Sequence, residues 1–310
     1  MSGPRPQRGR GARPQRPAAE LPAAGPPRHR AKGEETYHGV RACRALVAGR
    51  PGDMIRVYVA AEERRQWAAL LEHCAKARLG FRVVPGDNLS RISGSTHHEG
   101  IAILARSYRR WDAAELEAAV AAGGVAGPLL YLDGVGNPHN FGAILRTAAH
   151  FGCGAVLGRR GELPPLSPAA VRVAEGAAEH VPVCDVDDPA ATLARLKAAG
   201  FTVVATSSRG GEPLFTRGLS GRVVLVLGSE GEGVSRPLAA AADRCVRIPG
   251  SGAVESLNVS VACGVLLAEA WRGRKPAADG RPGGSQAGRG RTRGRQPRGP
   301  AASIGRRRVT

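Results

Sequence analysis

The segment LDGVGNPHNFGAILRTAAHFG, at 132–152, places polar side chains where a strand gives way to a helix. A strand is predicted to end at Asp133, and a Gly/Pro turn follows it. We expect Asn140 to cap the helix that begins there. Arg146 lies six residues further along this helix, among Ala and Leu. The segment alone leaves two alternatives, a substrate-binding pair or a plain cap with a surface arginine.

A second segment, VLVLGSEGEGVS at 224–235, ends a β-branched run at a loop with three glycines around Glu230. Such loops expose backbone N–H groups and let a ligand approach closely. The spacing matches neither a dinucleotide-binding motif nor a P-loop. A tight strand–helix turn without a ligand is the alternative.

The third segment, RIPGSGAVESLNVSVACGVLLAEA at 247–270, passes from a strand through a loop of small residues into a helix. Ser256, Leu257 and Asn258 open this helix, which is apolar nearly all round, so we expect it to be deeply packed. The glycines leave room for a flat ligand, and the helix end offers free N–H groups. Simple capping by the polar residues is the alternative.

The elements that must position these segments form a regular alternation. Short β-rich runs lie at 128–135, 154–158, 201–207, 222–228 and 245–249, and helical patterns at 140–152, 188–200, 235–243 and 256–272. This alternation predicts an α/β domain with a parallel sheet and helices on both faces. Ligands bind such sheets beyond the carboxyl ends of the strands. The three segments fall at those ends.

A smaller α/β module is predicted before this domain, at 36–106. Helices are expected at 37–49, 63–80 and 87–93, and strands at 55–60, 81–84 and 100–106. The stretch 107–127, a helix followed by a Gly-rich connector, is interpreted as a linker.

The charge of the chain is concentrated at its two ends. Of the net +19, residues 1–35 contribute eight Lys and Arg against three Glu, and residues 274–310 contribute eleven against one Asp. Both ends have few large apolar residues, so we predict disordered basic tails at 1–35 and 274–310. Such tails bind RNA through its phosphates without reading sequence. A purely solubilising role is the alternative.

The remaining composition bounds the class of protein. The chain has no run of eighteen apolar residues and no apolar secretory segment at its start, so we expect a cytoplasmic protein that does not bind a membrane. Its six cysteines form no C-x-x-C pair. Reduced thiols are therefore expected, with no metal site.

Together, the order and spacing of the three segments resemble the SpoU (TrmH-like) family of RNA 2′-O-ribose methyltransferases. The resemblance covers 128–273, and 36–106, which closes on HHEGIAILAR, is similar to the RNA substrate-binding domain of the family. AEGAAEHV at 174–181 and TSSRGGEPLF at 206–215 are most similar to members named only as general tRNA/rRNA methyltransferases.

The resemblance implies a SPOUT-type fold with a C-terminal trefoil knot, a homodimer, and S-adenosylmethionine held in the knot mainly by backbone groups. The cofactor positions that match are Thr206, Gly228, Ile248 and Leu257. The catalytic polar residues that match are Asn140, Arg146, Glu230, Ser256 and Asn258. One position departs from the pattern, because Gly250 stands where the family often has Met.

The activity implied is methyl transfer to a ribose 2′-hydroxyl of tRNA or rRNA. A guanidinium stays protonated in proteins, so we expect Arg146 to bind the adjacent phosphate and stabilise alkoxide charge instead of acting as a base. Asn140, Ser256 and Asn258 would position ribose and cofactor, and Glu230 would organise its loop. Two alternatives stay open, a non-catalytic RNA-binding or ribosome-assembly factor and a base-directed RNA methyltransferase.

Overall fold

The computed structural model describes residues 33–125 and 127–274. The predicted tails lie outside these residues, except for positions 33–35 and 274. No helix in the described part is long and apolar enough to cross a membrane.

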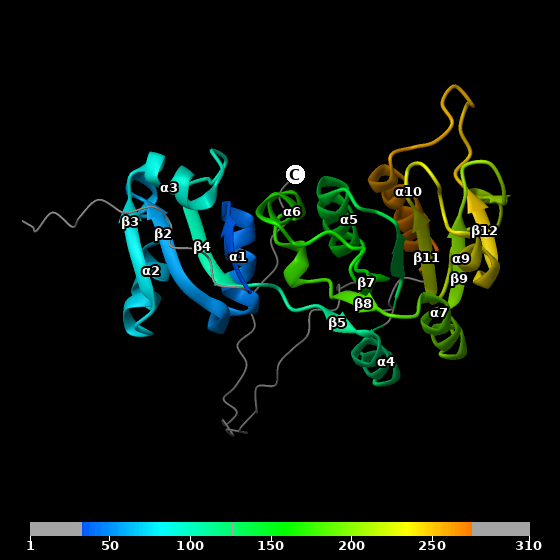
Figure 1. Cartoon of the computed structure of the whole chain (residues 1–310), viewed down its shortest axis with the longest axis horizontal. Helices are drawn as coiled ribbons and strands as arrows, with labels where there is room; N and C mark the ends of the chain where they lie inside the picture. Colours follow the sequence, from blue (N-terminus) through cyan, green and yellow to red (C-terminus); the bar gives the residue numbers. More distant parts are fainter. Residues whose placement is uncertain (1–32, 126, 275–310) are drawn as a thin grey trace, which may run out of the picture. The chain divides into compact units, whose positions relative to one another are not determined.

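The first domain is a four-stranded sheet in the order β1-β4-β2-β3 (Figure 1). Strand β4 is antiparallel to both β1 and β2, and β3 is parallel to β2 and forms an edge of the sheet. Its elements are β1 (Glu34–His38), α1 (Val40–Gly49), η1 (Pro51–Asp53), β2 (Met54–Ala60), η2 (Ala61–Glu63), α2 (Ala68–Lys76), β3 (Gly80–Val84), α3 (Gly86–Ser93) and β4 (Ile101–Arg106).

The beginning of this domain differs from the sequence prediction. Residues 34–38 form a strand, so the helix predicted from 37 begins only at Val40, and the strand takes in two residues assigned to the N-terminal tail. Gly39, with φ of 90°, separates the strand from the helix. The strand depends on pairing with β4, more than sixty residues away, and local pattern does not reveal such pairing.

The second domain is an eight-stranded sheet in the order β10-β12-β9-β11-β6-β7-β8-β5, and all its strand pairs are parallel. The predicted parallel α/β architecture is therefore confirmed. The elements are β5 (Trp111–Asp112), α4 (Ala113–Ala121), β6 (Leu129–Asp133), α5 (Pro138–His150), β7 (Ala155–Arg159), α6 (Pro168–Ala174), η3 (Ala177–Glu179), β8 (Val183–Val186), α7 (Pro189–Ala198), β9 (Thr202–Thr206), β10 (Glu212–Pro213), α8 (Leu214–Arg217), β11 (Val223–Gly228), α9 (Arg236–Ala241), β12 (Arg244–Arg247) and α10 (Val259–Arg272).

The segment interpreted as a linker belongs to this domain. Trp111 pairs with Cys184 of β8, so β5 is the last strand of the large sheet. Leu116 and Val120 of α4 are buried in its core. The two-residue strand β5 and the four-residue strand β8 are too short to show a periodic pattern, and the sequence analysis missed both.

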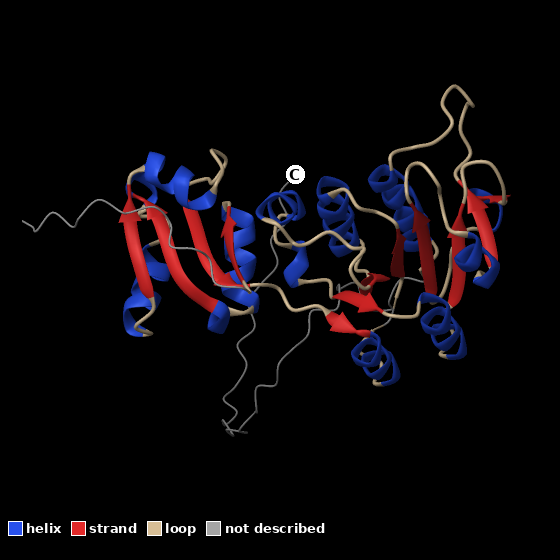
Figure 2. Cartoon of the chain, in the orientation of Figure 1, coloured by secondary structure: helices blue, strands red, loops and turns tan. Residues whose placement is uncertain are grey.

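Helices cover the large sheet on both faces, as Figure 2 shows. Alternate residues of β6 point to opposite faces. Leu130 and Leu132 pack with α5 and α10, whereas Leu129 and Tyr131 pack with α4, α7 and α9. The two cores hold the sheet rigid, so the loops at its carboxyl edge have a fixed base.

Helix α10 is buried on one face only, contrary to the expectation that it is deeply packed. Cys263, Leu266 and Leu267 are buried against the domain, but Val261 and Trp271 are 53 % and 50 % exposed. Trp271 contacts the ring of Phe151 and the guanidinium of Arg274, whereas Val261 is left exposed on the outer face of the helix.

Candidate active site

Four neighbouring strands, β12, β9, β11 and β6, direct their carboxyl ends to one edge of the large sheet. The loops that follow β6, β11 and β12 carry the three segments singled out in the sequence. A bond from the Ser235 N–H to Asp133 Oδ2, 2.7 Å long, ties the loop after β11 to the end of β6. A turn closed by the Gly233 N–H on the Ser229 carbonyl leaves Glu230 exposed within this loop.

Asn140, Glu230 and Asn258 form a hydrogen-bonded cluster that joins all three segments. Glu230 Oε1 accepts bonds from Asn140 Nδ2 at 2.9 Å and from Asn258 Nδ2 at 2.6 Å. Asn258 Nδ2 also lies 3.1 Å from Asn140 Oδ1, and the Val259 N–H lies 3.5 Å from the carboxylate. Residues separated by up to 118 positions in the chain thus share one site.

Asn140 does not cap α5, contrary to the sequence prediction. The N-cap is Asn137, whose Oδ1 accepts from the His139 N–H at 2.8 Å and from the Asn140 N–H at 3.4 Å. Pro138 explains the position, because proline is favoured as the first residue of a helix and fixes the residue before it as the cap. Asn140 lies in the first turn, and its side chain is free for Glu230.

Asn258 serves two purposes at the start of α10. Its Oδ1 accepts from the Ser260 N–H at 2.9 Å and from Ser260 Oγ at 2.6 Å, while its amide nitrogen donates to the cluster. The helix begins at Val259, so Ser256 and Leu257 lie in the preceding loop. Ser256 is exposed, and its side chain makes no hydrogen bond within the described residues.

Arg146 is not brought to the cluster within one chain. It lies six residues beyond Asn140 on α5, about 9 Å along the helix axis at 1.5 Å per residue. Its Nη2 lies 3.1 Å from Glu175 Oε2, and Glu175 also pairs with Arg41 of α1. The Arg146 side chain is 55 % exposed and lines a shallow hollow of about 520 Å³ together with His150, Glu175 and His180.

Sequence reasoning missed Glu175 as a partner of Arg146. It ends α6 in the left-handed region, with φ of 49°, and Gly176 follows it with φ of 84°. The motif that contains it, 174–181, was noted only for its family likeness. The sequence does show an acidic residue before a glycine at the end of a helix. Nothing in the sequence indicates that this residue pairs with Arg146.

The four positions expected to contact S-adenosylmethionine lie at or beyond the ends of β9, β11 and β12. Gly228 leaves no space for a side chain, because a Cβ there would overlap the backbone of Gly233. Thr206 donates its hydroxyl to the Val226 carbonyl at 3.0 Å, which ties β9 to β11. Ile248 is partly buried, and Leu257 is 43 % exposed.

The loop between β12 and α10 suits a ligand held by backbone groups, and Figure 1 shows it extending from the sheet edge. The N–H groups of 254–258 donate to no group in the described part of the chain. A Cβ at Gly250 would meet nothing within 4 Å. The glycine that departs from the family pattern therefore leaves the space beside this loop open. Exposed Val254 and Leu257 offer apolar surface to a flat ring.

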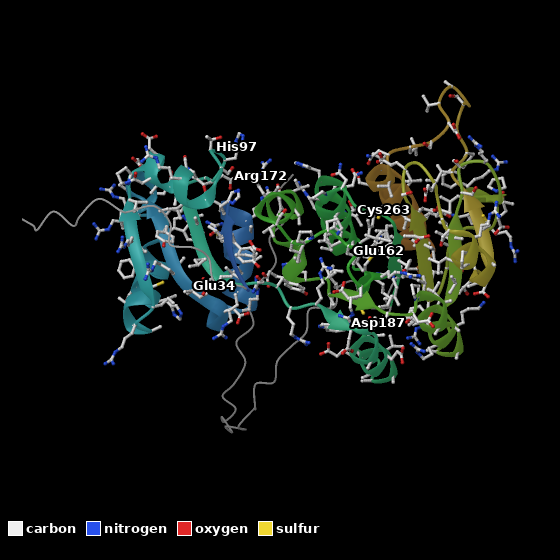
Figure 3. The ribbon with its side chains drawn as sticks, viewed as in Figure 1. Glu34, His97, Glu162, Arg172, Asp187 and Cys263 are labelled. Atoms are coloured by element: carbon white, nitrogen blue, oxygen red, sulfur yellow. The ribbon has the colours of Figure 1, made fainter. Side chains whose placement is uncertain are left out.

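The cysteines take no part in this chemistry. All six are free thiols, and five of them are buried. Burial raises the pKa of Cys153 to about 12, and it also raises the pKa of Cys263, which lies within the packed helix α10 (Figure 3). These thiols are neutral and are not nucleophiles. In the part of the chain that the structure describes, no group of three His, Cys, Asp or Glu is arranged to hold a metal ion.

The chain is thus a two-domain α/β protein, in which a small sheet domain precedes a parallel sheet that carries a polar cluster at its carboxyl edge. The SpoU rRNA methylase family model matches residues 127–268, and the model for RNA 2′-O ribose methyltransferase substrate binding matches 38–111. The chain belongs to the SpoU family. It is an S-adenosylmethionine-dependent RNA methyltransferase that acts on a ribose 2′-hydroxyl.

Individual relatives agree with this assignment. The chain is 38 % identical over 247 residues to the uncharacterized tRNA/rRNA methyltransferase YfiF of Escherichia coli O157:H7, covering 79 % of this chain and 70 % of that one. It is 38 % identical over 238 residues to the 23S rRNA (guanosine-2′-O-)-methyltransferase RlmB of a Burkholderia species, covering 76 % and 96 %. An AdoMet-bound rRNA methyltransferase from Sinorhizobium meliloti superposes with a TM-score of 0.63 at 26 % identity, covering 77 % and 87 %.

Proposed function

We propose that the substrate is 23S rRNA and that the methyl group goes to the ribose of a guanosine. Relatives that align over most of their own length, including the Burkholderia protein, bear that activity in their names. The observation in this chain that supports the proposal is the Asn140–Glu230–Asn258 cluster. It keeps the polar groups of all three motifs together at the carboxyl edge of the sheet.

Each member of the cluster has a separate role in this proposal. Bound S-adenosylmethionine supplies an activated methyl group, and backbone groups near Thr206, Gly228, Ile248 and Leu257 hold it. Glu230 and Asn258 orient the amide of Asn140, and the N–H and lone pair that this amide keeps free position the ribose. The exposed hydroxyl of Ser256 contacts ribose or cofactor.

Arg146 is assigned an electrostatic role. A guanidinium stays charged at all relevant pH values, so it binds the phosphate beside the target nucleotide and stabilises negative charge on the attacking oxygen. Its present partner, Glu175, is 30 % exposed and already shared with Arg41, so a phosphate is able to compete for the guanidinium. No metal is needed in this scheme, because the methyl group arrives activated.

We also propose that two copies of the chain associate through α10. Val261, Ala268 and Trp271 are exposed on one side of the helix, and Val261 and Trp271 are half exposed. Val265, which is partly buried against the core, lies between them and completes an apolar stripe. Soluble monomers rarely leave a contiguous apolar stripe in water. A second copy on this face would bring further residues toward the cluster, which in one chain lacks Arg146.

The family expectation of a trefoil knot is retained as part of the proposal. Helix α10 packs against α5 and β11, although the strand before it, β12, lies beyond β9 in the sheet. The chain must therefore return across the carboxyl edge, where Asn258 meets the loop after β11. An experimental electron-density trace of 228–259 tests whether it passes through that loop. We place the protein in the cytoplasm, with its RNA substrate.

The test of the substrate is the position of the methyl group. Unmodified 23S rRNA transcripts and an unmodified tRNA pool are incubated with the full chain and labelled S-adenosylmethionine, and the label is mapped to single nucleotides. We expect one guanosine in 23S rRNA, with the adjacent linkage resistant to alkali. Label confined to tRNA would overturn the rRNA proposal and leave the enzyme class intact.

A further inference from the structure

A groove in the first domain lies between helix α2 and the edge strand β3. Phe81 and Val83 of β3 form one wall and Ala68 and Leu71 of α2 the other, around a hollow of about 530 Å³. Phe81 and Val83 are each 39 % exposed, among the few large apolar side chains left in water. The groove belongs to the region that matches the substrate-binding family model, but no residue of it entered the site described above.

Two arginines stand at the rim of this groove with their charges unpaired. The side chains of Arg64 and Arg65 make no ion pair or hydrogen bond with any residue in the described ranges. The acidic residue in the lining, Glu72, is paired with Lys76 at 2.7 Å. By contrast, the adjacent arginines Arg159 and Arg160 of the second domain are paired with Glu162 at 3.5 Å and Asp187 at 2.6 Å, two acids that Figure 3 labels.

We propose that this groove binds an unpaired nucleotide of the RNA substrate, with its base stacked on Phe81 and its phosphates on Arg64 and Arg65. Every base has a flat π-face that stacks on an aromatic ring, and guanidinium groups bind phosphate bidentately. Specific RNA recognition usually targets unpaired nucleotides. In this proposal the first domain contacts the RNA through residues that are far in the sequence from those of methyl transfer.

The edge of β3 favours RNA over an added protein strand. One side of this strand has no neighbouring strand in the sheet, so half of its backbone N–H and C=O groups are available. Arg82 lies in the middle of the strand, and a charged residue there opposes pairing with another strand. The same backbone groups are able to bond the edge of a stacked base.

The inference rests on the proposed function for the identity of the RNA, but binding to the groove is measured without methyl transfer. The probe is an eight-nucleotide oligoadenylate with 2-aminopurine at its centre, titrated with the full chain at several salt concentrations. The variants are Phe81→Leu, which keeps apolar volume but removes the ring, and the double variant Arg64→Gln with Arg65→Gln. All proteins carry the same basic tails, so binding by the tails cancels in the comparison.

We expect the 2-aminopurine fluorescence to be quenched on binding to the unaltered chain. Phe81→Leu should lose this quenching and bind about tenfold or more weakly, at an unchanged salt slope. The double arginine variant should keep the quenching but lower the magnitude of the slope of log K against log salt by about 1.4, at about 0.7 per phosphate contact.

Matched controls come from the second domain. Phe215→Leu removes an exposed ring elsewhere, since Phe215 is 54 % exposed, and Arg159→Gln with Arg160→Gln removes an ion-paired arginine couple. Both should bind the probe as the unaltered chain does. Unchanged quenching and an unchanged salt slope in the groove variants would overturn the proposal that the groove binds RNA. A protein partner would then be the alternative occupant of the groove.

Methyl transfer to 23S rRNA, measured with the same variants, separates this inference from the proposed function. A groove that acts only in binding predicts a raised KM and an unchanged kcat for Phe81→Leu. Failure of the unaltered chain to methylate 23S rRNA would refute the proposed substrate. The oligonucleotide titration would still show whether the groove binds a nucleotide. An altered kcat with unaltered oligonucleotide binding would contradict the proposal that the groove binds RNA.

Discussion

At the residue scale, the site depends on how three side chains divide their polar atoms. Asn258 uses its oxygen to cap α10 and its nitrogen to reach Glu230 and Asn140. An asparagine is required for both tasks, because aspartate has no donor when ionised and serine has no second polar atom.

Replacing Asn258 by Asp separates its two tasks. Aspartate is as good an N-cap as asparagine, so the melting temperature should change little. It places a second carboxylate beside Glu230, however, and removes the donor. We expect kcat for methyl transfer to fall by about tenfold to a hundredfold, the cost of about 1.5–3 kcal/mol for a bond to a charged group. Full activity in Asn258→Asp would contradict the role of the cluster.

Arg146 is tested by changing its geometry at constant charge. If the guanidinium acts through its charge, Arg146→Lys should retain part of the activity that Arg146→Ala loses. The measurement is single-turnover methyl transfer at saturating RNA for both variants. An activity of the Lys variant no higher than that of the Ala variant would argue against a purely electrostatic role.

At the element scale, the cap of α5 can be separated from the active site. Asn137→Ala removes the cap and should lower the free energy of unfolding by about 1 kcal/mol. Asn140→Ala leaves the cap and should affect methyl transfer far more than stability. Denaturant unfolding of the two variants, beside their transfer rates, checks this division. A larger loss of stability in Asn140→Ala would restore Asn140 as the cap.

The buried end of β1 makes the first domain sensitive to acid. His38 is 3 % exposed, its Nδ1 has no hydrogen-bond partner, and burial lowers its pKa below 6.5, with Arg172 and His98 adding to the effect and the nearby Glu99 opposing it. The unfolded chain then binds the proton more readily than the folded one. Stability is therefore full above pH 6.5 and falls as the pH drops below it.

This pH dependence is measured as the free energy of unfolding between pH 5 and pH 8, two values chosen to bracket the ordinary pKa of about 6.5. His38→Leu removes the titrating group and should flatten the curve in that window. A variant that keeps the same slope would show that other groups cause it.

The sequence predicted long elements well and short ones poorly. The parallel alternation from β6 to α10 follows from continuous β-branched runs and helical periodicity, so most of the large sheet was foreseen. Strands β1, β5 and β8 were missed because their stability comes from neighbours distant in the chain. At the site, the meeting of Asn140, Glu230 and Asn258 follows from the carboxyl-edge rule, whereas the Arg146–Glu175 pair has no signature in spacing.

At the scale of the whole molecule, the proposed dimer is tested at the outer face of α10. Val261→Lys places a charge at the N-terminal end of the apolar stripe on α10 and leaves the buried face of the helix unaltered. We expect a monomer by sedimentation or light scattering, with a melting temperature close to that of the unaltered chain. A dimer that persists in Val261→Lys would show that the interface does not lie on α10.

The central claim is that this chain transfers methyl groups to ribose through the cluster around Glu230. The most direct test is labelled methyl transfer to unmodified 23S rRNA by the unaltered chain and by Glu230→Gln, followed by digestion to nucleosides. The account predicts 2′-O-methylguanosine from the unaltered chain and a rate about thirtyfold lower from Glu230→Gln. Both asparagine amides donate to Glu230 Oε1, and a neutral amide oxygen binds the two donors less strongly than a charged carboxylate does, at a cost of about 2 kcal/mol over the two bonds. Label on a base, or equal rates for the two proteins, would contradict it.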